Sequence, residues 1–428
     1  MAVSHIGEAR PTRVRHTMLA LIATGTLINY LDRTILGVAA PSLTRELGID
    51  AALMGVIFSA FSWSYAAAQV PGGAFLDRFG TRLTYCLSVG LWSLLTLFQA
   101  FVGGVATLIG LRLALGVAES PCFPANSRVV ATWFPRQERA FATGVYTVGE
   151  YIGLAFLSPL LFAMMAAFGW RSLFVVAGAI GILFAGVWWS GYREPRQSRA
   201  NQAELDLIVA GGALLDQPVR PKFDWTGAGR LLRTRQMWGI CLGQFAGNST
   251  LVFFLTWFPT YLATERHMDW LKIGIFAVAP FIAASVGVLF GGWWSDRMLR
   301  QGHSPNVARK LPIILGLLLA STIIGANFVE SNIAVIAILS VAFFAQGMAA
   351  LGWTLVSDLA PEGMLGVTGG VFNLAANLAG IVTPIVVGAI VATTGSFFYA
   401  LAFIGVVALL GALSYIFILG DVRRIVLD

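Results

Sequence analysis

The chain has 428 residues, of which 57% are hydrophobic and only 11% are charged. Soluble domains contain about 25% charged residues, so this composition excludes a soluble globular protein and indicates an integral membrane protein. The net charge of +7 does not indicate a nucleic-acid partner, because the basic residues sort by side of the membrane, as described below. We therefore expect a lipid bilayer as the surroundings of the chain.

Apolar segments of the length that a membrane-spanning helix needs, about 20 residues, recur along the whole chain. We predict an all-α integral membrane fold with twelve transmembrane helices in two pseudo-symmetric halves of six helices. The expected spans of the first half are residues 17–39, 53–76, 83–101, 105–126, 139–165 and 171–191. Those of the second half are residues 237–262, 272–295, 311–329, 332–356, 364–393 and 397–420.

The positions of the 28 Lys and Arg residues predict the orientation of these spans. With both termini on the same side, 22 of them lie on that side, four lie in the opposite loops and two lie within spans. The positive-inside rule assigns the basic side to the cytoplasm. The predicted divisions are a cytoplasmic N-terminal tail (1–16), a six-helix bundle (17–191), a cytoplasmic linker (192–236), a second six-helix bundle (237–420) and a cytoplasmic tail (421–428).

An internal repeat supports the division into two halves. An Asp-Arg pair follows the second expected span and recurs 219 residues later, and a Gly and a Pro of the fifth span recur at an offset of 225 residues. A parallel repeat of this kind is typical of transporters that rock two halves about a central site. We predict that the two loops latch the cytoplasmic side through Gly73, Asp77 and Arg78 in the first copy and Asp296 and Arg297 in the second.

Ionisable residues inside the expected spans are few: Asp32, Arg33, Arg112, Glu119 and Glu150. Each costs a few kcal/mol to insert, so such residues face the interior of the bundle and mark functional sites. The two arginines favour an anionic substrate, because a guanidinium binds a carboxylate or phosphate through two hydrogen bonds. The three carboxylates are candidates for taking up protons. Purely structural ion pairs among these residues remain the alternative.

Arg112 and Glu119 are seven residues apart, so two helical turns place them on one face. Pro121 and Pro124 follow and should interrupt the helix, and exposed carbonyls in a membrane are tolerated only where they line a wet cavity. We therefore expect a water-filled site beside Glu119.

The second half offers amides in place of charges. Gln244 and Asn248, and likewise Asn373 and Asn377, are four residues apart, so each pair shares a helix face. Such neutral donors and acceptors suit hydroxyl groups, although amides that only bridge helices remain possible. Charge in one half and hydrogen bonds in the other together predict a hydroxylated carboxylic acid as the substrate.

Several segments carry a family resemblance. The loop Gly73-Ala-Phe-Leu-Asp77-Arg78-Phe-Gly-Thr-Arg resembles the signature of the major facilitator superfamily. The segments around Asn29-Tyr30-Leu-Asp32-Arg33, Gly116 to Asn126, Gly243 to Thr250 and Phe372 to Gly380 resemble its anion:cation symporter family, most of all the bacterial D-galactonate and hexuronate symporters. The resemblance covers essentially the whole chain.

The resemblance implies proton-driven uptake of a sugar acid through the bacterial inner membrane by a multi-pass protein. It further implies that Arg33 holds the substrate carboxylate, that Asp32 and Glu119 take up protons and that Arg112 pairs with a carboxylate. Sugar hydroxyls would contact Tyr30, Tyr65, Gln244 and Asn373. Protons would be the coupling ion, no other cofactor is expected, and we expect a monomer.

Glu150 departs from the family pattern, because a glutamine is expected at its position. We assign it both to proton coupling and to substrate binding, and the exact substrate and proton count depend on its role.

Other functions fit less well. An organophosphate or dicarboxylate exchanger of the same fold remains an alternative, although such exchangers place an arginine in the seventh helix as well, where this chain has none. A drug antiporter does not suit an arginine-lined cavity. No histidine lies in an expected span, so we predict neither a metal site nor the nucleophile and base of a membrane enzyme. A non-transporting membrane sensor also remains open.

Overall fold

The computed structural model of the chain describes residues 10–135, 138–213, 229–361 and 364–426, and the regular elements within them are helices. The first half contains α1 (Val14–Leu47), α2 (Ala51–Gln99), α3 (Val105–Glu119), α4 (Cys122–Trp133), α5 (Arg139–Phe168) and α6 (Trp170–Gly191). The linker contains η1 (Pro195–Gln197) and α7 (Gln202–Ala210). The second half contains α9 (Arg235–Thr256), α10 (Phe258–Thr260), η2 (Tyr261–Glu265), α11 (Trp270–Arg300), α12 (Pro305–Ala320), η3 (Ser321–Phe328), α13 (Asn332–Ala349), α14 (Gly352–Leu359), α15 (Leu365–Thr394), α16 (Phe398–Leu413) and η4 (Ser414–Ile418).

The helices are long and apolar, as the composition predicts. Within the described ranges, nine helices have the length and hydropathy needed to cross a membrane. The three remaining expected spans fall on α1, on the second part of α2 and on α5, which are all helical. The all-α membrane class is therefore confirmed, and the full count of twelve remains a prediction at those three places.

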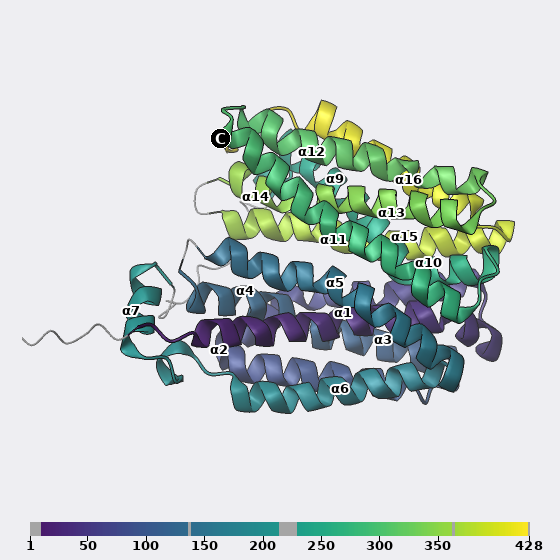
Figure 1. The fold of residues 1–428 in the computed structure, drawn as a ribbon, viewed down its shortest axis with the longest axis horizontal. Helices are drawn as coiled ribbons and strands as arrows, with labels where there is room; N and C mark the ends of the chain where they lie inside the picture. Colours follow the sequence, from purple (N-terminus) through teal and green to yellow (C-terminus); the bar gives the residue numbers. More distant parts are fainter. Residues whose placement is uncertain (1–9, 136–137, 214–228, 362–363, 427–428) are drawn as a thin grey trace, which may run out of the picture.

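The two halves form two groups of helices (Figure 1), with α1 to α6 in one and α9 to α16 in the other. We call the end of the molecule where α7, α14 and the beginning of α1 lie the proximal end, and the opposite end the distal end. Helix α1 begins at Val14 and α9 at Arg235, close to the expected starts at residues 17 and 237. Residues 1–9, 214–228 and 427–428 of the tails and linker lie outside the described residues.

The connection between the second and third spans is a tight turn at Gly80, with helix on both sides of it. Helix α2 continues from Ala51 to Gln99, and its helical path is interrupted at Gly80. Gly80 adopts φ 76° and ψ 168°, a backbone conformation that residues other than glycine rarely adopt. The second copy of the motif likewise lies inside α11, which continues to Arg300. One glycine is thus enough to reverse the chain at the proximal end.

The two halves contact each other closely at the distal end. A Cβ atom added at Gly55 of α2 would overlap the carbonyl of Pro384 in α15, and one added at Gly388 would overlap the carbonyl of Ala51. Gly37 of α1 approaches the backbone at the end of α9 in the same way. Glycine at these positions lets the backbones of the two halves meet, which closes the distal end.

The expected break in the fourth span is present. Helix α3 ends at Glu119 and α4 begins at Cys122, next to Pro121. Proline lacks an N–H and clashes with the preceding turn, so the helix cannot continue through this segment. The break places the carboxylate of Glu119 at the end of a helix, in the interior of the first half.

The first part of the linker is fastened to the first half. Glu204 of α7 is fully buried and accepts hydrogen bonds from the backbone N–H groups of Val14 and Arg15 at 3.1 Å each. It thereby caps the beginning of α1, where the N–H groups have no partner in the helix. Arg15 also pairs with Glu138 before α5 at 3.0 Å. Helix α7 therefore belongs with the first half.

Candidate functional site

The centre of the site is an ion pair between α1 and α3. Arg33 donates from Nε and Nη2 to the same oxygen of Glu119, Oε2, at 3.1 and 3.0 Å. Glu119 is fully buried, whereas the Arg33 side chain retains 18% of its exposure. The second oxygen of Glu119, Oε1, has no hydrogen-bond partner. Glu119 itself is thus buried in this conformation, and the water-filled site beside it stays a prediction.

Aromatic rings surround the guanidinium of Arg33. Its Cζ atom lies 4.8 to 6.0 Å from the centroids of four rings, those of Tyr30, Phe61, Tyr65 and Phe123. A cation over an aromatic face is attracted by the ring electrons, and the attraction increases where water is excluded. The structure thus brings the predicted residues Tyr30, Tyr65 and Arg33 together.

Arg112 lies behind this pair. Its side chain is 3% exposed, and its Cζ lies 5.1 Å from the centroid of Phe61. It is close enough to Glu119 and Asp32 to interact with their charges, but its Nε and Nη1 atoms have no hydrogen-bond partner. In this conformation Arg33 makes the hydrogen bonds to Glu119, and the pairing of Arg112 with a carboxylate stays a prediction.

Asp32 faces a different direction from Arg33, because consecutive residues on a helix diverge by about 100°. It is 2% exposed, and neither carboxylate oxygen has a hydrogen-bond partner. Its surroundings are the charges of Glu119 and Arg112 and the indole N–H of Trp92 on α2. Asn29, one turn earlier on α1, is fully buried and neighbours Glu119. Asp32 thus points into the interior of the first half.

The amides of the second half lie on α9 and α15, as predicted. Asn248 donates to the carbonyl of Ala376 at 2.6 Å, and Asn377 donates to the carbonyl of Asn373 at 3.1 Å. Gln244 and Asn373 are half-buried. In this conformation Asn248 bridges two helices, the alternative that the sequence left open, while its carbonyl oxygen and the other amides remain available for hydroxyl groups.

The side chain of Glu150 falls among the residues that are not described. Its backbone lies in α5, and its predicted roles in proton coupling and substrate binding remain predictions.

The acidic residues of the two Asp-Arg motifs, Asp77-Arg78 and Asp296-Arg297, pair with basic residues on other helices. Asp77 lies 3.6 Å from Nη1 of Arg128 on α4, and Asp296 lies 3.2 Å from Nη1 of Arg309 on α12. Arg309 also reaches Asp358 of α14 at 3.4 Å. The basic residues of the motifs contact aromatic rings instead, Arg78 that of Phe79 and Arg297 that of Trp293. Gly73 has open space where a side chain would lie.

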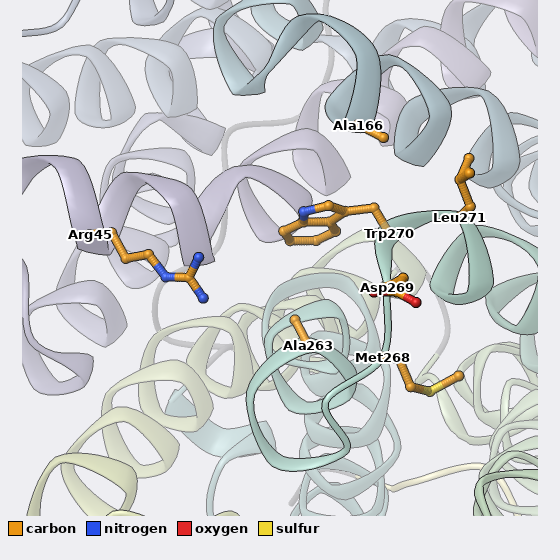
Figure 2. Close-up of a pocket in the computed structure, with 7 residues that line it drawn as sticks. All are labelled: Arg45, Ala166, Ala263, Met268, Asp269, Trp270 and Leu271. Atoms are coloured by element: carbon orange, nitrogen blue, oxygen red, sulfur yellow. The ribbon is translucent and has the colours of Figure 1, made fainter.

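A hollow of about 290 Å³ lies at the distal end, away from these charges. Figure 2 shows Arg45 pointing from α1 toward the ring of Trp270, with Ala166 of α5 on one side and Ala263 on the other. A second, apolar hollow lies between α9, α16 and η4. Neither hollow contains a residue predicted for the substrate site.

Comparison with known proteins decides the family. The family model of the Major Facilitator Superfamily matches residues 22–384. The D-galactonate transporter of Escherichia coli is 46% identical over 431 residues, which cover 98% of this chain and 99% of that protein. The chain belongs to the Major Facilitator Superfamily.

Other superfamily members agree with this assignment. The probable galactarate/D-glucarate transporter of Escherichia coli is 40% identical over 97% of this chain and 95% of that protein, and the one of Bacillus subtilis is 40% identical over 98% and 94%. A crystal structure of a bacterial homologue of the human lysosomal transporter Spinster, inward-facing and occupied, has a TM-score of 0.73 at 18% identity and covers 95% of this chain and 97% of that one. This last similarity concerns the fold alone.

Membership of the Major Facilitator Superfamily confirms that the chain is a multi-pass membrane transporter and not an enzyme. Three residues of the site were not predicted from the sequence. Phe61 and Phe123 lie beside the guanidinium of Arg33, and Trp92 lies beside Asp32. Trp92 could have been found, because polar residues recur on its face of α2 with helical spacing. The two phenylalanines give no such signal, since apolar residues are everywhere in this chain.

Proposed function

We propose that this chain imports a small hydroxylated organic anion, a sugar acid, together with protons. The observation that carries the proposal is the bond between Arg33 and one oxygen of Glu119. A guanidinium in an aromatic surrounding is a site for a carboxylate. The names of its relatives, a D-galactonate transporter and probable galactarate/D-glucarate transporters, support a sugar acid as that anion.

Competition for Arg33 supplies the coupling to protons. A substrate carboxylate that binds Arg33 displaces Glu119, which is fully buried. An unpaired carboxylate in such a place is costly, so Glu119 takes up a proton. When Glu119 later loses this proton, it binds Arg33 again and expels the substrate. Asp32, buried without a partner, is the second proton-binding residue.

The exposure of the two arginines favours a monocarboxylate, an aldonate or hexuronate, over an aldarate. Arg33 retains 18% of its side-chain exposure, whereas Arg112 is 3% exposed. One accessible guanidinium suits one carboxylate. The hydroxyl groups would bind Tyr30 and Tyr65 in the first half, and in the second half the amides of Gln244, Asn248, Asn373 and Asn377.

Orientation follows from the basic residues. If the proximal end is cytoplasmic, as the positive-inside rule predicts, the glycine contacts at the distal end close the outer side. The conformation described is then inward-facing, in which substrate leaves to the cytoplasm. We place the protein in the inner membrane of a bacterium, as a monomer with both termini in the cytoplasm.

The test is uptake of labelled D-galactonate, D-glucuronate and galactarate into proteoliposomes with an acidic exterior. We expect D-galactonate or D-glucuronate to accumulate, and the accumulation to disappear when a protonophore removes the pH gradient. Uptake that ignores the gradient but requires an internal anion would establish exchange in place of symport. Binding without any uptake would establish a sensor.

A further inference from the structure

Asp32 needs a route for protons. In the conformation described its carboxylate oxygens are buried, and Arg33, not Asp32, retains exposure. Of the polar residues around Asp32, which also include Glu119 and Arg112, Trp92 lies on the second part of α2. A route to Asp32 should therefore be sought inside the first half.

The second part of α2 has a continuous polar face. Six of its members recur every three or four residues, which places them along one side of the helix, and the seventh, Thr84, lies beside Tyr85. All are at most 6% exposed: Thr81, Thr84, Tyr85, Ser88, Trp92, Thr96 and Gln99. We call these residues the polar stripe. The opposite side of the same helix is apolar and exposed, with Leu87 and Leu91 about half exposed, as expected of a lipid-facing surface.

Hydroxyl groups of the polar stripe lack the bonds that such groups usually make in helices. A buried Thr or Ser commonly donates to the carbonyl four residues earlier, as Thr26 and Thr34 do here at 2.8 Å each. The hydroxyls of Thr81, Thr84 and Thr96 make no such bond. They are therefore free to bind a mobile partner.

The stripe leads to Asp32 at one point and to the proximal surface at its beginning. Next to Asp32 lies Trp92, whose Nε1 faces the carboxylate without a direct hydrogen bond. At the proximal end Thr81 faces the hydroxyl of Tyr192 and the carboxylate of Glu194, and Tyr192 also has no direct hydrogen-bond partner. Polar groups that neighbour each other beyond direct bonding distance or geometry are typically bridged by water.

Between these two ends lies Tyr85. Its hydroxyl faces Asn126 of α4 but makes no direct hydrogen bond. Asn126 in turn donates to Thr26 of α1 at 3.0 Å. Stripe members three or four residues apart lie about 5 Å apart along the helix axis, a span that one water molecule bridges.

The stripe lies away from the interface between the halves. The second part of α2 packs against α6, where the ring of Tyr85 stacks on Trp188 at 4.0 Å and a Cβ at Gly181 would overlap Ser93. Figure 1 shows α6 on the side of the first half that is turned away from the second half. A route along this stripe is thus separate from a substrate path between the halves.

We infer that protons move between Asp32 and the proximal surface along the polar stripe, through water bound to its hydroxyls, with Glu194 as the group at the mouth. The inference rests on the proposed proton symport. Each hydroxyl or water accepts a proton from one neighbour and donates one to the next, so no group changes its net charge when a proton passes. The indole N–H of Trp92 only donates, so Trp92 orients the last water at Asp32 and the proton passes through that water. Thr84 and Tyr85 are the stripe hydroxyls between Thr81 and Ser88.

Glu194 suits the position at the mouth. It follows α6 directly and is half-buried. Burial raises the pKa of its carboxyl group, while the guanidinium of Arg128 and the hydroxyls of Thr81 and Tyr192 act in the opposite direction. A carboxyl group whose pKa moves toward neutrality exchanges protons efficiently with the solvent.

The test separates proton movement from substrate movement in proteoliposomes. Proton-driven uptake of D-galactonate requires protons to leave on the inside, whereas counterflow exchanges labelled for unlabelled D-galactonate without net proton release. Thr84→Val and Tyr85→Phe keep the shape and remove the hydroxyl. We expect each to slow proton-driven uptake, followed with a pH-sensitive dye inside the vesicles, by roughly tenfold or more, as for a lost proton-transfer group. Counterflow should keep the wild-type rate.

Two control variants accompany these. Thr84→Ser retains the hydroxyl and should restore proton-driven uptake. Thr383→Val removes a hydroxyl of α15 that is likewise buried and without a partner, and it should leave both rates unchanged.

Each other outcome overturns the route. Wild-type rates of proton-driven uptake in Thr84→Val and Tyr85→Phe would show that protons reach Asp32 elsewhere, and symport itself would stand. An equal loss of uptake and counterflow would show that the stripe only supports the fold. If the wild-type protein accumulated D-galactonate independently of the pH gradient, both the proposed symport and the route would fail.

Discussion

Arg33 binds Glu119 through two hydrogen bonds to a single oxygen, Oε2, and Oε1 remains without a partner. Two donors on one acceptor atom are weaker than two parallel bonds to both oxygens, the geometry in which guanidinium and carboxylate match best. A substrate carboxylate that uses both of its oxygens therefore competes well for Arg33. The pair between Arg33 and a single oxygen of Glu119 can therefore be replaced by a substrate carboxylate.

Arg33→Lys should weaken binding of D-galactonate by roughly ten- to a hundredfold, equivalent to about 1.4 to 2.8 kcal/mol. An ammonium group cannot reproduce the planar pair of donors or stack on the surrounding rings. The measurement is a titration of the purified protein by calorimetry or thermal shift. Arg45→Lys, in the distal hollow, is the matched control and should bind normally. Wild-type affinity in Arg33→Lys would place the anion site elsewhere.

Glu119→Gln should retain counterflow and lose accumulation driven by a pH gradient. The amide resembles the protonated acid, so it leaves Arg33 free for the substrate, but it cannot release a proton. Binding of D-galactonate should also become less dependent on pH than in the wild-type protein. Accumulation at the wild-type level would remove Glu119 from the coupling mechanism.

Gly388→Val should favour a conformation that is open at the distal end. The added side chain would overlap the carbonyl of Ala51, so α2 and α15 could no longer meet. A cysteine introduced at Ser62, which contacts Gly380 in the same interface, should react faster with an impermeant maleimide added from that side. Gly110→Val, at an exposed position with open space around it, is the control. Unchanged labelling in Gly388→Val would mean that these contacts do not control closure.

Glu46→Gln should lower thermal stability at neutral pH. Hydrogen bonds from Arg171 and from Nε1 of Trp170 lower the pKa of Glu46 from 4.5 to about 2. A lowered pKa contributes stability above the unfolded value, which is lost as the pH falls through the folded value. The difference in melting temperature between wild type and Glu46→Gln should therefore be constant from neutral pH to about pH 5 and disappear toward pH 2.

The matched control for Glu46→Gln is Asp269→Asn, whose partner Lys272 is 67% exposed. Such exposed pairs contribute little, so its melting temperature should match the wild type. A difference for Glu46→Gln that grows in acid would contradict the assignment.

Much of the protein could be predicted from the sequence, because the free-energy cost of placing a residue in a bilayer depends mainly on that residue and its own helix. Apolar runs identify membrane helices since their backbone groups must be satisfied within each segment. Charges such as Asp32, Arg33 and Glu119 stand out because each is expensive in a bilayer. The internal repeat, in which Pro384 of the second half corresponds to Pro159 of the first, can likewise be found from the sequence alone.

Only the tertiary structure decided which charges pair. Arg33 binds Glu119 through two hydrogen bonds. The Nε and Nη1 atoms of the neighbouring Arg112 have no hydrogen-bond partner. Either arginine could have paired with Glu119 on spacing alone, because the choice depends on how far α1 is rotated and how closely it approaches α3. The same rotation turns Asp32 away from Arg33 and toward Trp92. Sequence spacing fixes the face of a residue on its own helix, whereas packing of helices against each other determines what that face meets.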